Sequence, residues 1–457
     1  MEKETMHWLR ERLAGFGDRE ALCGYGGAAT YAQLARRVDD WGERLGEMGV
    51  ARGETVSVVG DTTPGLAALF LALALRGGTV VPLAPADPPV AARPSRLATA
   101  HVTRVVEFLS ADVWTVSEVA PPDTPLPVRL AELRDCGDAG LVLFSSGSTG
   151  EAKAALLSLT RLLAPMRDGG ARPLRTVQFM GPDHIGGVNT LLRTLTSGGT
   201  LVTEPRRTPE RICAAVAEHR AQLLPTTPSF LTMLLMSGAH READLSSLEL
   251  ISYGTEPMRE VTLAHLAKEF PGVRLKQTYG LTETGILPTR SRASDSLRMD
   301  VGGHGFELRI VDGVLWIKSP TAMLGYLNAP DPFDADGWLN TGDAVETGED
   351  GALRVIGRAS SLINVGGEKV HPAEVENVLL GADNVRDVVV EGKPNPVTGQ
   401  VVVATVELVA PEDPRELGRR LRALCAGQLA PHKSPAVFRV SEGPLYSGRF
   451  KRRGGIA

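Results

Sequence analysis

The chain has 457 residues, which is more than one hydrophobic core usually accommodates, so we expect two or more domains. Hydrophobic residues make up 43% and charged residues 23%, a balance that excludes a disordered or fibrous protein. With 49 Lys and Arg against 54 Asp and Glu, the net charge is −5, which argues against nucleic acid or an anionic membrane as the main partner.

The first part of the chain alternates helical periods with short apolar runs. The spacing predicts a helix over 31–48, a buried strand at 56–59, a helix from Pro64 and a strand at 79–83. Residues 65–74 are apolar throughout, but they are roughly half as long as a membrane-spanning helix, so they predict a buried helix. Strands alternating with helices predict a mainly parallel sheet covered on both faces.

After about residue 305 the pattern changes to short strands separated by turns. The strands are predicted at 308–311, 314–318 and 353–356, and Asp-Gly pairs at 312–313, 336–337 and 350–351 predict hairpin turns. The last part of the chain predicts helices at 372–380 and 413–428 and strands at 385–390 and 401–408. We expect a large N-terminal α/β domain over 1–357, with parallel sheets and a β-rich subregion, and a small α+β domain over 358–457.

The cysteines and the N-terminal segment predict a cytoplasmic protein. Cys23, Cys136, Cys213 and Cys425 lie far apart without a CxxC or another metal-ligand spacing, which is typical of reduced thiols. The charged N-terminal segment lacks the apolar centre of a signal peptide.

A loop of small and hydroxyl residues follows an apolar strand at 141–144. Its sequence, Ser145-Ser-Gly-Ser-Thr-Gly150, is followed closely by Lys153. Glycines allow backbone N–H groups to approach phosphate oxygens, hydroxyls add donors, and a lysine supplies a positive charge. The loop therefore predicts a phosphate site, although it lacks the Walker A spacing.

These residues resemble the phosphate loop of the adenylate-forming superfamily, which includes acyl-CoA synthetases, nonribosomal adenylation domains and luciferases. Further similar motifs follow in the same order: Tyr279-Gly-Leu-Thr-Glu283, Trp338-Leu-Asn-Thr-Gly-Asp343, Gly357-Arg358, and Ile363-Asn-Val-Gly-Gly-Glu-Lys-Val-His-Pro-Ala-Glu-Val-Glu376. Matches in this order over most of the chain make the resemblance specific.

The resemblance implies ATP and Mg²⁺ as cofactors. Thr149 would hold phosphates, Glu283 would bind the metal, Asp343 would accept hydrogen bonds from the ribose hydroxyls, and Tyr279 would stack on adenine. The implied nucleotide-binding residues are Ser145, Ser146, Gly147, Ser148, Thr149, Gly150, Lys153, Gly254, Thr255, Glu256, Thr278, Tyr279, Gly280, Thr282, Asp343 and Arg358.

The family activates a carboxylic acid as its adenylate, with release of pyrophosphate. Its C-terminal domain is mobile and rotates about a hinge, here at Ser360, so that a thiol reaches the adenylate; the loop at Gly366 and Gly367 is presented in that second pose. The acceptor would be coenzyme A or a carrier protein.

Two positions depart from the family pattern. The family carries a catalytic lysine near its C-terminus, and Arg449 stands there in this sequence, with Lys451 two residues later. Arginine keeps the charge but is planar and forked, so it is not equivalent to lysine at a point-charge site. Ser360 stands where the family hinge usually has Asp or Lys, and serine still permits a backbone rotation. The catalytic candidates are Thr149, Glu283, Arg449 and Lys451.

The acid pocket is predicted around Asp183-His-Ile-Gly-Gly-Val-Asn189. Its candidate lining residues are His184, Gly186, Gly187, Tyr253 and Gly280. A lone histidine is more often a packed or solvated residue, and here only its place in the motif favours the pocket.

The leading hypothesis is an ATP-dependent ligase for an aryl or acyl acid. Arg449 leaves open a relative that activates nitrite to diazotise an aromatic amine, or one that forms an amide. A nucleotide-binding scaffold without catalysis is a further alternative. The sequence does not identify the acid, the acceptor or the oligomeric state.

Overall fold

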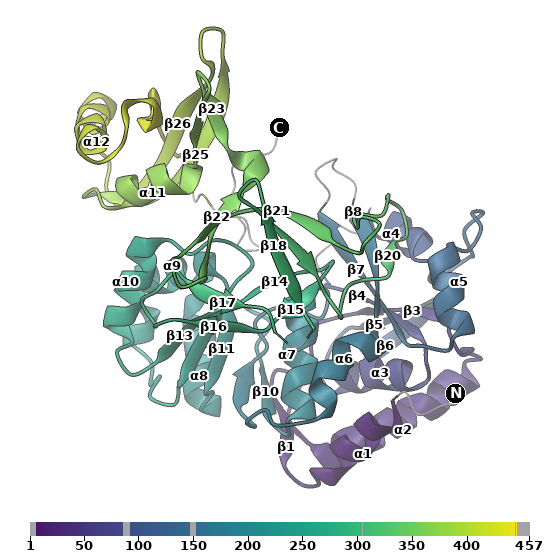
Figure 1. The fold of residues 1–457 in the computed structure, drawn as a ribbon. Coiled ribbons are helices and arrows are strands. Elements are labelled where there is room, and N and C mark those ends of the chain that lie inside the picture. Colours follow the sequence, from purple (N-terminus) through teal and green to yellow (C-terminus); the bar gives the residue numbers. More distant parts are fainter. Residues whose placement is uncertain (1–5, 86–91, 147–151, 304, 444, 446–457) are drawn as a thin grey trace.

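The computed structural model describes residues 6–85, 92–146, 152–303, 305–443 and 445. Two seven-stranded sheets form the body of the large domain (Figure 1). In the first sheet the four central strands are parallel, and each of the three outer strands pairs antiparallel with its inner neighbour. Its order is β20 (Gly325–Tyr326), β8 (Ala152–Ser158), β7 (Gly140–Ser146), β4 (Thr79–Leu83), β3 (Thr55–Val59), β5 (Arg104–Phe108) and β6 (Trp114–Glu118).

The second sheet is parallel except for its last strand. Its order is β13 (Arg274–Gln277), β12 (Leu250–Tyr253), β11 (Leu223–Thr226), β9 (Arg175–Val177), β10 (Thr200–Thr203), β1 (Glu20–Gly24) and β2 (Ala29–Thr30). The predicted mainly parallel sheets are therefore confirmed.

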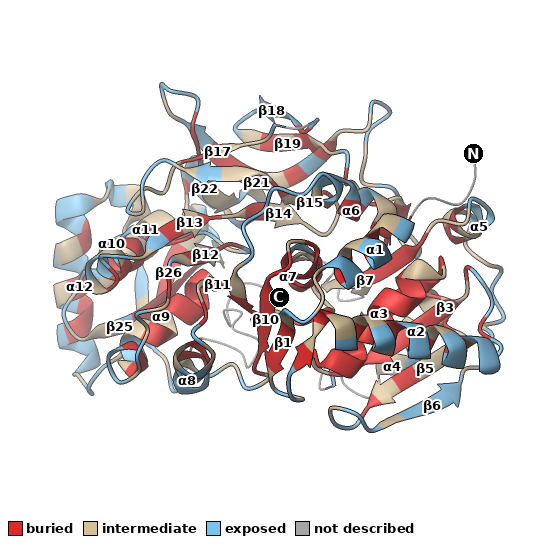
Figure 2. Ribbon diagram, turned by 90° about the horizontal axis from the view of Figure 1, so that it is seen from below, coloured by how far each residue is buried: buried red, intermediate tan, exposed pale blue. Residues whose placement is uncertain are grey.

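Helices cover both sheets, and two of them are largely buried. They are α1 (His7–Gly15), α2 (Tyr31–Glu47), α3 (Pro64–Leu75), α4 (Arg93–Thr99), α5 (Val128–Asp135), α6 (Leu159–Arg167), α7 (Ile185–Thr196), α8 (Pro209–His219), α9 (Pro228–Ser237) and α10 (Glu260–Glu269). The Thr63 hydroxyl accepts the N–H of Leu66 and starts α3, whose residues from Pro64 to Ala74 are all buried. Helix α7 lies in the interior, as the burial colours of Figure 2 show. No helix among the described residues combines the length and the apolar character of a membrane span.

A third, antiparallel sheet forms the predicted β-rich subregion. Its order is β16 (Thr289–Ser291), β17 (Met299–Val301), β22 (Leu353–Arg358), β21 (Leu339–Thr347), β19 (Val314–Lys318) and β18 (Glu307–Val311), and a separate hairpin joins β14 (Tyr279–Leu281) to β15 (Gly285–Leu287). Asp312 and Gly313 have φ of 52° and 76° and turn β18 directly into β19, as the Asp-Gly pair predicts. The other two Asp-Gly pairs also lie in turns between antiparallel partners.

The small C-terminal unit packs two helices against one sheet and has its own apolar core. Its elements are β23 (Ile363–Val365), β24 (Glu368–Val370), α11 (Pro372–Leu380), β25 (Val385–Asn395), β26 (Gly399–Leu408), α12 (Pro414–Gln428) and β27 (Val437–Val440). The Asp413 carboxylate caps α12 by accepting hydrogen bonds from the N–H groups of Arg415 and Glu416. The helix therefore begins at Pro414, one residue later than predicted. β22 ends at Arg358 and a short 3₁₀ helix, Ala359–Ser361, leads into β23; the domain division at 357/358 stays a prediction.

Candidate active site

Several of the described candidate residues lie at the carboxyl ends of parallel strands. Ser145 and Ser146 end β7, Gly254 follows β12, and Thr278 follows β13. In open α/β sheets this edge is where ligands bind. The third sheet adds Asp343 from β21, whose carboxylate contacts Tyr279 of β14.

Two neighbouring side chains contact the Asp343 carboxylate. The Tyr279 hydroxyl donates to Oδ2 at 2.5 Å, and Arg358 Nε lies 3.3 Å from Oδ1. Arg358 stands opposite Asp343 in the β21–β22 register and donates through Nη1 to the carbonyl of Thr341 at 2.5 Å. Burial raises the pKa of Asp343, whereas Arg358 and the Tyr279 hydroxyl oppose that rise. Both carboxylate oxygens therefore have a fixed orientation.

Glu283 lies between the two short strands β14 and β15. Its backbone carbonyl accepts the N–H of Met323 at 2.9 Å, and its carboxylate accepts a hydrogen bond from the Tyr326 hydroxyl. Lys153 Nζ lies 5.3 Å from the centre of the Tyr326 ring. Burial raises the pKa of Tyr326, and the neighbouring Glu283 carboxylate raises it further.

Tyr326 was not among the residues predicted from the sequence. It lies on β20, where it pairs with Ala155 of β8, the strand that begins just after the phosphate loop. This antiparallel pairing brings Tyr326 to Lys153 and Glu283. A single tyrosine after a glycine carries no spacing signal, so sequence reasoning had no means of finding it.

The segment Gly254–Glu256 is held tightly against Thr278. A Cβ atom at Gly254 would lie 2.5 Å from Thr278 Oγ1, so only glycine fits there. Thr255 has φ of 75°, a conformation that a β-branched residue rarely adopts and that is often found at functional sites. The Glu256 carboxylate accepts the N–H of Ser229 at 2.6 Å, at the start of α9.

Tyr253 and Tyr279 are both buried, with 1% and 8% of their surface exposed. The Tyr279 ring belongs to the apolar cluster that contains Leu287 and Met299. Gly280 lies in the same strand, where a Cβ atom would come 2.5 Å from the carbonyl oxygen of Gly285. Stacking of Tyr279 on adenine, like the pocket roles of Tyr253 and Gly280, stays a prediction.

The predicted acid-pocket segment lies at the start of α7. The His184 side chain is 42% exposed, and its Nε2 lies 3.9 Å from Asp183 Oδ2. A Cβ atom at Gly187 would lie 1.8 Å from the carbonyl oxygen of Gly181, and one at Gly186 would lie 2.4 Å from Met180 Cε. These glycines make room for the neighbouring backbone and for Met180, and their role beside a bound acid stays a prediction.

Several predicted residues lie outside the described part of the chain. These are Gly147, Ser148, Thr149, Gly150, Arg449 and Lys451. Ser145 pairs with Lys153 between β7 and β8, and Thr282 lies in the turn between β14 and β15. The hinge candidate, Ser360, lies in the 3₁₀ helix after β22.

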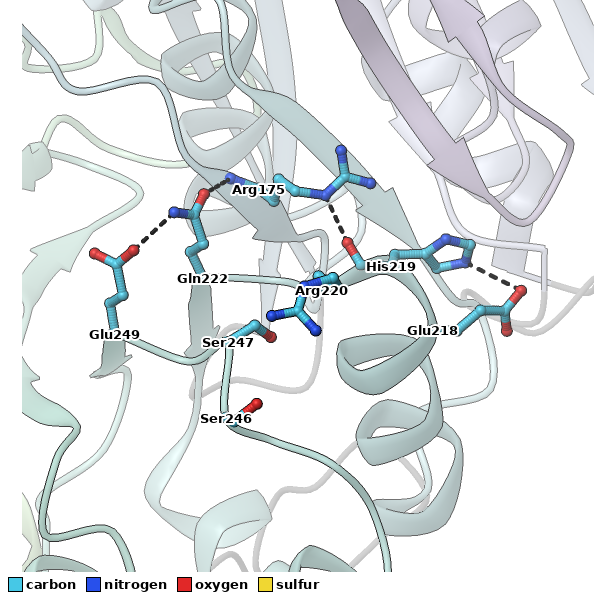
Figure 3. Close-up of a pocket in the computed structure, with 8 residues that line it drawn as sticks. All are labelled: Arg175, Glu218, His219, Arg220, Gln222, Ser246, Ser247 and Glu249. Atoms are coloured by element: carbon cyan, nitrogen blue, oxygen red, sulfur yellow. Dashed lines mark hydrogen bonds and ion pairs between the residues drawn. The ribbon is translucent and has the colours of Figure 1, made fainter.

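A cavity of about 590 Å³ lies at the opposite ends of the strands of the second sheet from Gly254 and Thr278 (Figure 3). Its lining residues are Arg175, Glu218, His219, Arg220, Gln222, Ser246, Ser247 and Glu249. Arg175 begins β9, and Gln222 and Glu249 immediately precede β11 and β12, so the cavity lies at the amino ends of these strands. Arg175 Nε donates to the carbonyl of His219 at 2.5 Å and Gln222 Nε2 to Glu249 at 2.7 Å, contacts that brace the loops of the sheet.

Family models and known relatives indicate the same protein family for this chain. The family model described as AMP-binding enzyme matches residues 9–327, and the model for the AMP-binding enzyme C-terminal domain matches residues 374–446. The chain is 30% identical to the 4-coumarate–CoA ligase-like 6 of Oryza sativa subsp. japonica, over 86% of this chain and 76% of the relative. It is also 30% identical to the indoleacetate–CoA ligase of Aromatoleum aromaticum, over 89% of this chain and 88% of the relative.

The fold also matches a solved structure closely. A crystal structure of the anthranilate CoA ligase AuaEII in complex with anthranoyl-AMP superimposes with a TM-score of 0.83, covering 99% of this chain and 96% of that chain. The two sequences are 18% identical, so this likeness shows the fold. Together with the family models, it shows that the chain belongs to the AMP-binding enzyme family of the adenylate-forming superfamily and is an AMP-forming ligase.

Proposed function

We propose that this ligase activates an aryl or acyl carboxylic acid with ATP and transfers the acyl group to coenzyme A or a carrier thiol. The observation that carries the proposal is the buried Asp343 carboxylate, held from one side by Tyr279 and from the other by Arg358. The relatives named above, a 4-coumarate–CoA ligase-like protein and an indoleacetate–CoA ligase, support the choice of an aryl or acyl acid.

In this proposal Asp343 binds the ribose of ATP. One oxygen of the carboxylate contacts Tyr279 and the other contacts Arg358, and each oxygen has a second lone pair. These second lone pairs accept hydrogen bonds from the two ribose hydroxyls. Lys153 and the loop at 145–150 bind the phosphates. Because Tyr279 and Arg358 already orient the acceptor, little freedom is lost when the nucleotide binds.

The donor set around Glu283 fits Mg²⁺. This ion prefers hard oxygen ligands and commonly binds one or two carboxylates together with phosphate oxygens and water. The hydrogen bond from Tyr326 orients Oε1 of Glu283, and the second carboxylate oxygen would bind the metal. When bound, the ion would neutralise charge that develops on the phosphates.

The proposed reaction has two steps, and it needs no reactant other than ATP, the acid and the thiol. A carboxylate oxygen of the acid attacks the α-phosphorus of ATP, the bond to the bridging oxygen breaks, and pyrophosphate leaves. The thiolate then attacks the acyl carbon, the carbon–oxygen bond of the adenylate breaks, and AMP leaves with the oxygen that came from the acid.

A screen of substrates tests this function. Release of pyrophosphate would be measured with ATP, Mg²⁺ and one candidate at a time: aromatic acids, fatty acids, and nitrite with an arylamine. We expect release that depends on a carboxylic acid and a thioester after addition of coenzyme A. Three results would each contradict the proposal: pyrophosphate release with nitrite and an arylamine but with no carboxylic acid, an amide as the product, or ATP binding without any pyrophosphate release.

Replacement of Tyr326 by phenylalanine tests the metal site. Loss of an outer hydrogen bond to a metal ligand typically weakens metal affinity by about 10–100-fold, so Tyr326→Phe should raise the Mg²⁺ concentration needed for tight ATP binding by roughly tenfold or more. Calorimetric titration of ATP at several Mg²⁺ concentrations measures this shift. Tyr25→Phe, at an exposed tyrosine, is the matched control. An unchanged Mg²⁺ dependence in Tyr326→Phe would show that this hydroxyl has no part in the metal site.

A further inference from the structure

The short strand β20 pairs with only part of β8. The two strands lie side by side in Figure 1 and run antiparallel, with Tyr326 opposite Ala155. The N–H of Leu327 continues the pairing by donating to the carbonyl of Ala154 at 2.9 Å. β20 ends at Tyr326, whereas β8 begins at Ala152, so the pairing of the two strands stops short of the start of β8.

The side chain of Asn328 continues the contact with β8 beyond this point. Its Oδ1 accepts the N–H of Ala154 at 2.8 Å, and its Nδ2 donates to the carbonyl of Ala152 at 3.0 Å. The amide thus binds the residue on each side of Lys153, much as the backbone of a neighbouring strand would. A carboxamide suits this place because one contact needs an acceptor and the other needs a donor.

β7 holds the opposite edge of β8 at the same residues. Ser145 pairs with Lys153, and Ser146 pairs with Ala152, in the antiparallel register of the two strands. The backbone around Lys153 is therefore fastened on one side by the β7 ladder and on the other side by the Asn328 amide.

The place of this backbone decides where the Lys153 ammonium lies. Lysine has a flexible stem of four carbons, so its charge is only as well placed as the Cα atom from which it extends. Lys153 Nζ lies 5.3 Å from the centre of the Tyr326 ring, a cation–π contact, and the Tyr326 hydroxyl donates to Glu283. A shift at the start of β8 would carry the ammonium away from this ring and from the Glu283 side of the site.

We propose that Asn328 is a positioning residue for Lys153: by fastening Ala152 and Ala154, it holds the Lys153 ammonium where it binds the phosphates of ATP. This role rests on the proposed binding of phosphates by Lys153. Asn328 acts through the lysine and does not touch the nucleotide itself. Its loss should therefore weaken the binding of phosphates and spare the binding of the nucleoside.

The affinities for ATP and for adenosine separate this role from a general loss of structure. Both would be measured by isothermal titration for the unmodified chain, Asn328→Ala, Lys153→Ala and the double variant, with Mg²⁺ at saturation. Asn384→Ala is the matched control. The Asn384 amide also binds a backbone N–H and a backbone carbonyl, both of Ala410 in the small domain, at 2.8 Å and 2.9 Å.

Lys153→Ala should weaken ATP binding by roughly 10–100-fold, the effect of one lost contact with a charged group. We expect Asn328→Ala to weaken ATP binding by roughly tenfold, because the displaced ammonium keeps only part of its attraction to the phosphates. Adenosine affinity should stay within about twofold in every variant, and Asn328→Ala should add little to the loss already caused by Lys153→Ala. Asn384→Ala should bind ATP like the unmodified chain.

Three results would overturn the role of Asn328. Unchanged ATP affinity in Asn328→Ala, beside a loss in Lys153→Ala, would do so and leave the proposed function intact. A loss that extends equally to adenosine, or that adds in full to the loss in Lys153→Ala, would show that Asn328 supports the fold at large. Unchanged ATP affinity in Lys153→Ala would contradict the phosphate role of that lysine as well. If Asn328→Ala does not fold, Asn328→Asp, which keeps the acceptor and loses the donor, carries the same expectations.

Discussion

Replacement of Asp343 by alanine is expected to weaken ATP binding roughly a hundredfold. The change removes the acceptor of two charge-assisted hydrogen bonds to the ribose, each worth about 1.5 kcal/mol or more. It also leaves the Tyr279 hydroxyl and the Arg358 guanidinium without their shared partner. Isothermal titration with ATP measures the loss, and with AMP it separates the ribose contact from the phosphate contacts.

Two further variants show whether the loss belongs to this carboxylate. Asp343→Asn keeps the shape but lacks the negative charge, and it should fall between the unmodified chain and Asp343→Ala. Asp334 pairs with Arg309 at 2.9 Å and is the control, because its replacement by alanine also removes a carboxylate from an ion pair. Unchanged ATP affinity in Asp343→Ala would mean that Asp343 does not contact the ribose.

Replacement of Arg449 by alanine is expected to slow adenylate formation by roughly a hundredfold or more, the effect of one lost transition-state donor. Arg449 stands at the position of the catalytic lysine in the resemblance to the family and lies outside the described residues. Because the family uses its other domain pose for the second step, thiol transfer from a pre-formed adenylate should change little. Rapid-quench measurement of each half-reaction separates the two effects.

Arg449→Lys and Lys451→Ala decide how the arginine acts. If the positive charge alone matters, Arg449→Lys should form the adenylate at the rate of the unmodified chain. If the forked guanidinium is fitted to a different anion, Arg449→Lys should lose adenylate formation. Loss of the first step in Lys451→Ala, with Arg449→Ala unaffected, would show that the alignment of this segment is wrong by two residues.

The local elements of this fold were predictable because they depend on short-range patterns. The apolar periodicity predicted the helix that begins at Tyr31, and its N-terminal residue is preceded by Thr30, whose hydroxyl accepts the N–H of Gln33. The Asp-Gly pair at 312–313 predicted a hairpin because both of its residues adopt positive φ. Residues 65–74 were predicted as a buried helix, and every one of them is buried in α3.

The contacts between distant segments were not predictable in the same way. Tyr326 reaches Glu283 across 43 positions, and Arg259 reaches Asp387 across 128, so no periodicity or motif connects either pair. Asp343 and Tyr279 were both expected to bind the nucleotide, but their mutual hydrogen bond follows from the meeting of two sheets. The motif order predicted which residues bind the nucleotide, and that prediction still awaits a test, whereas the contacts that orient Asp343 and Glu283 could be found only from the fold.

Gly187 shows that a glycine predicted to line a pocket can be required by the fold for a different reason. A small residue beside a predicted pocket suggests space for a ligand. In the fold, the backbone of Gly181 approaches so closely that any side chain at Gly187 would collide with it. The helix α7 therefore needs glycine there whatever the acid is.

The fate of an oxygen atom tests most directly whether this enzyme activates a carboxylic acid as its adenylate. The acid identified in the screen would be labelled with ¹⁸O in its carboxylate and turned over with ATP, Mg²⁺ and coenzyme A, and the nucleotide product would be examined by mass spectrometry. The mechanism predicts AMP that carries one ¹⁸O atom from the acid together with unlabelled pyrophosphate. AMP without the label, or ADP as the product, would contradict it.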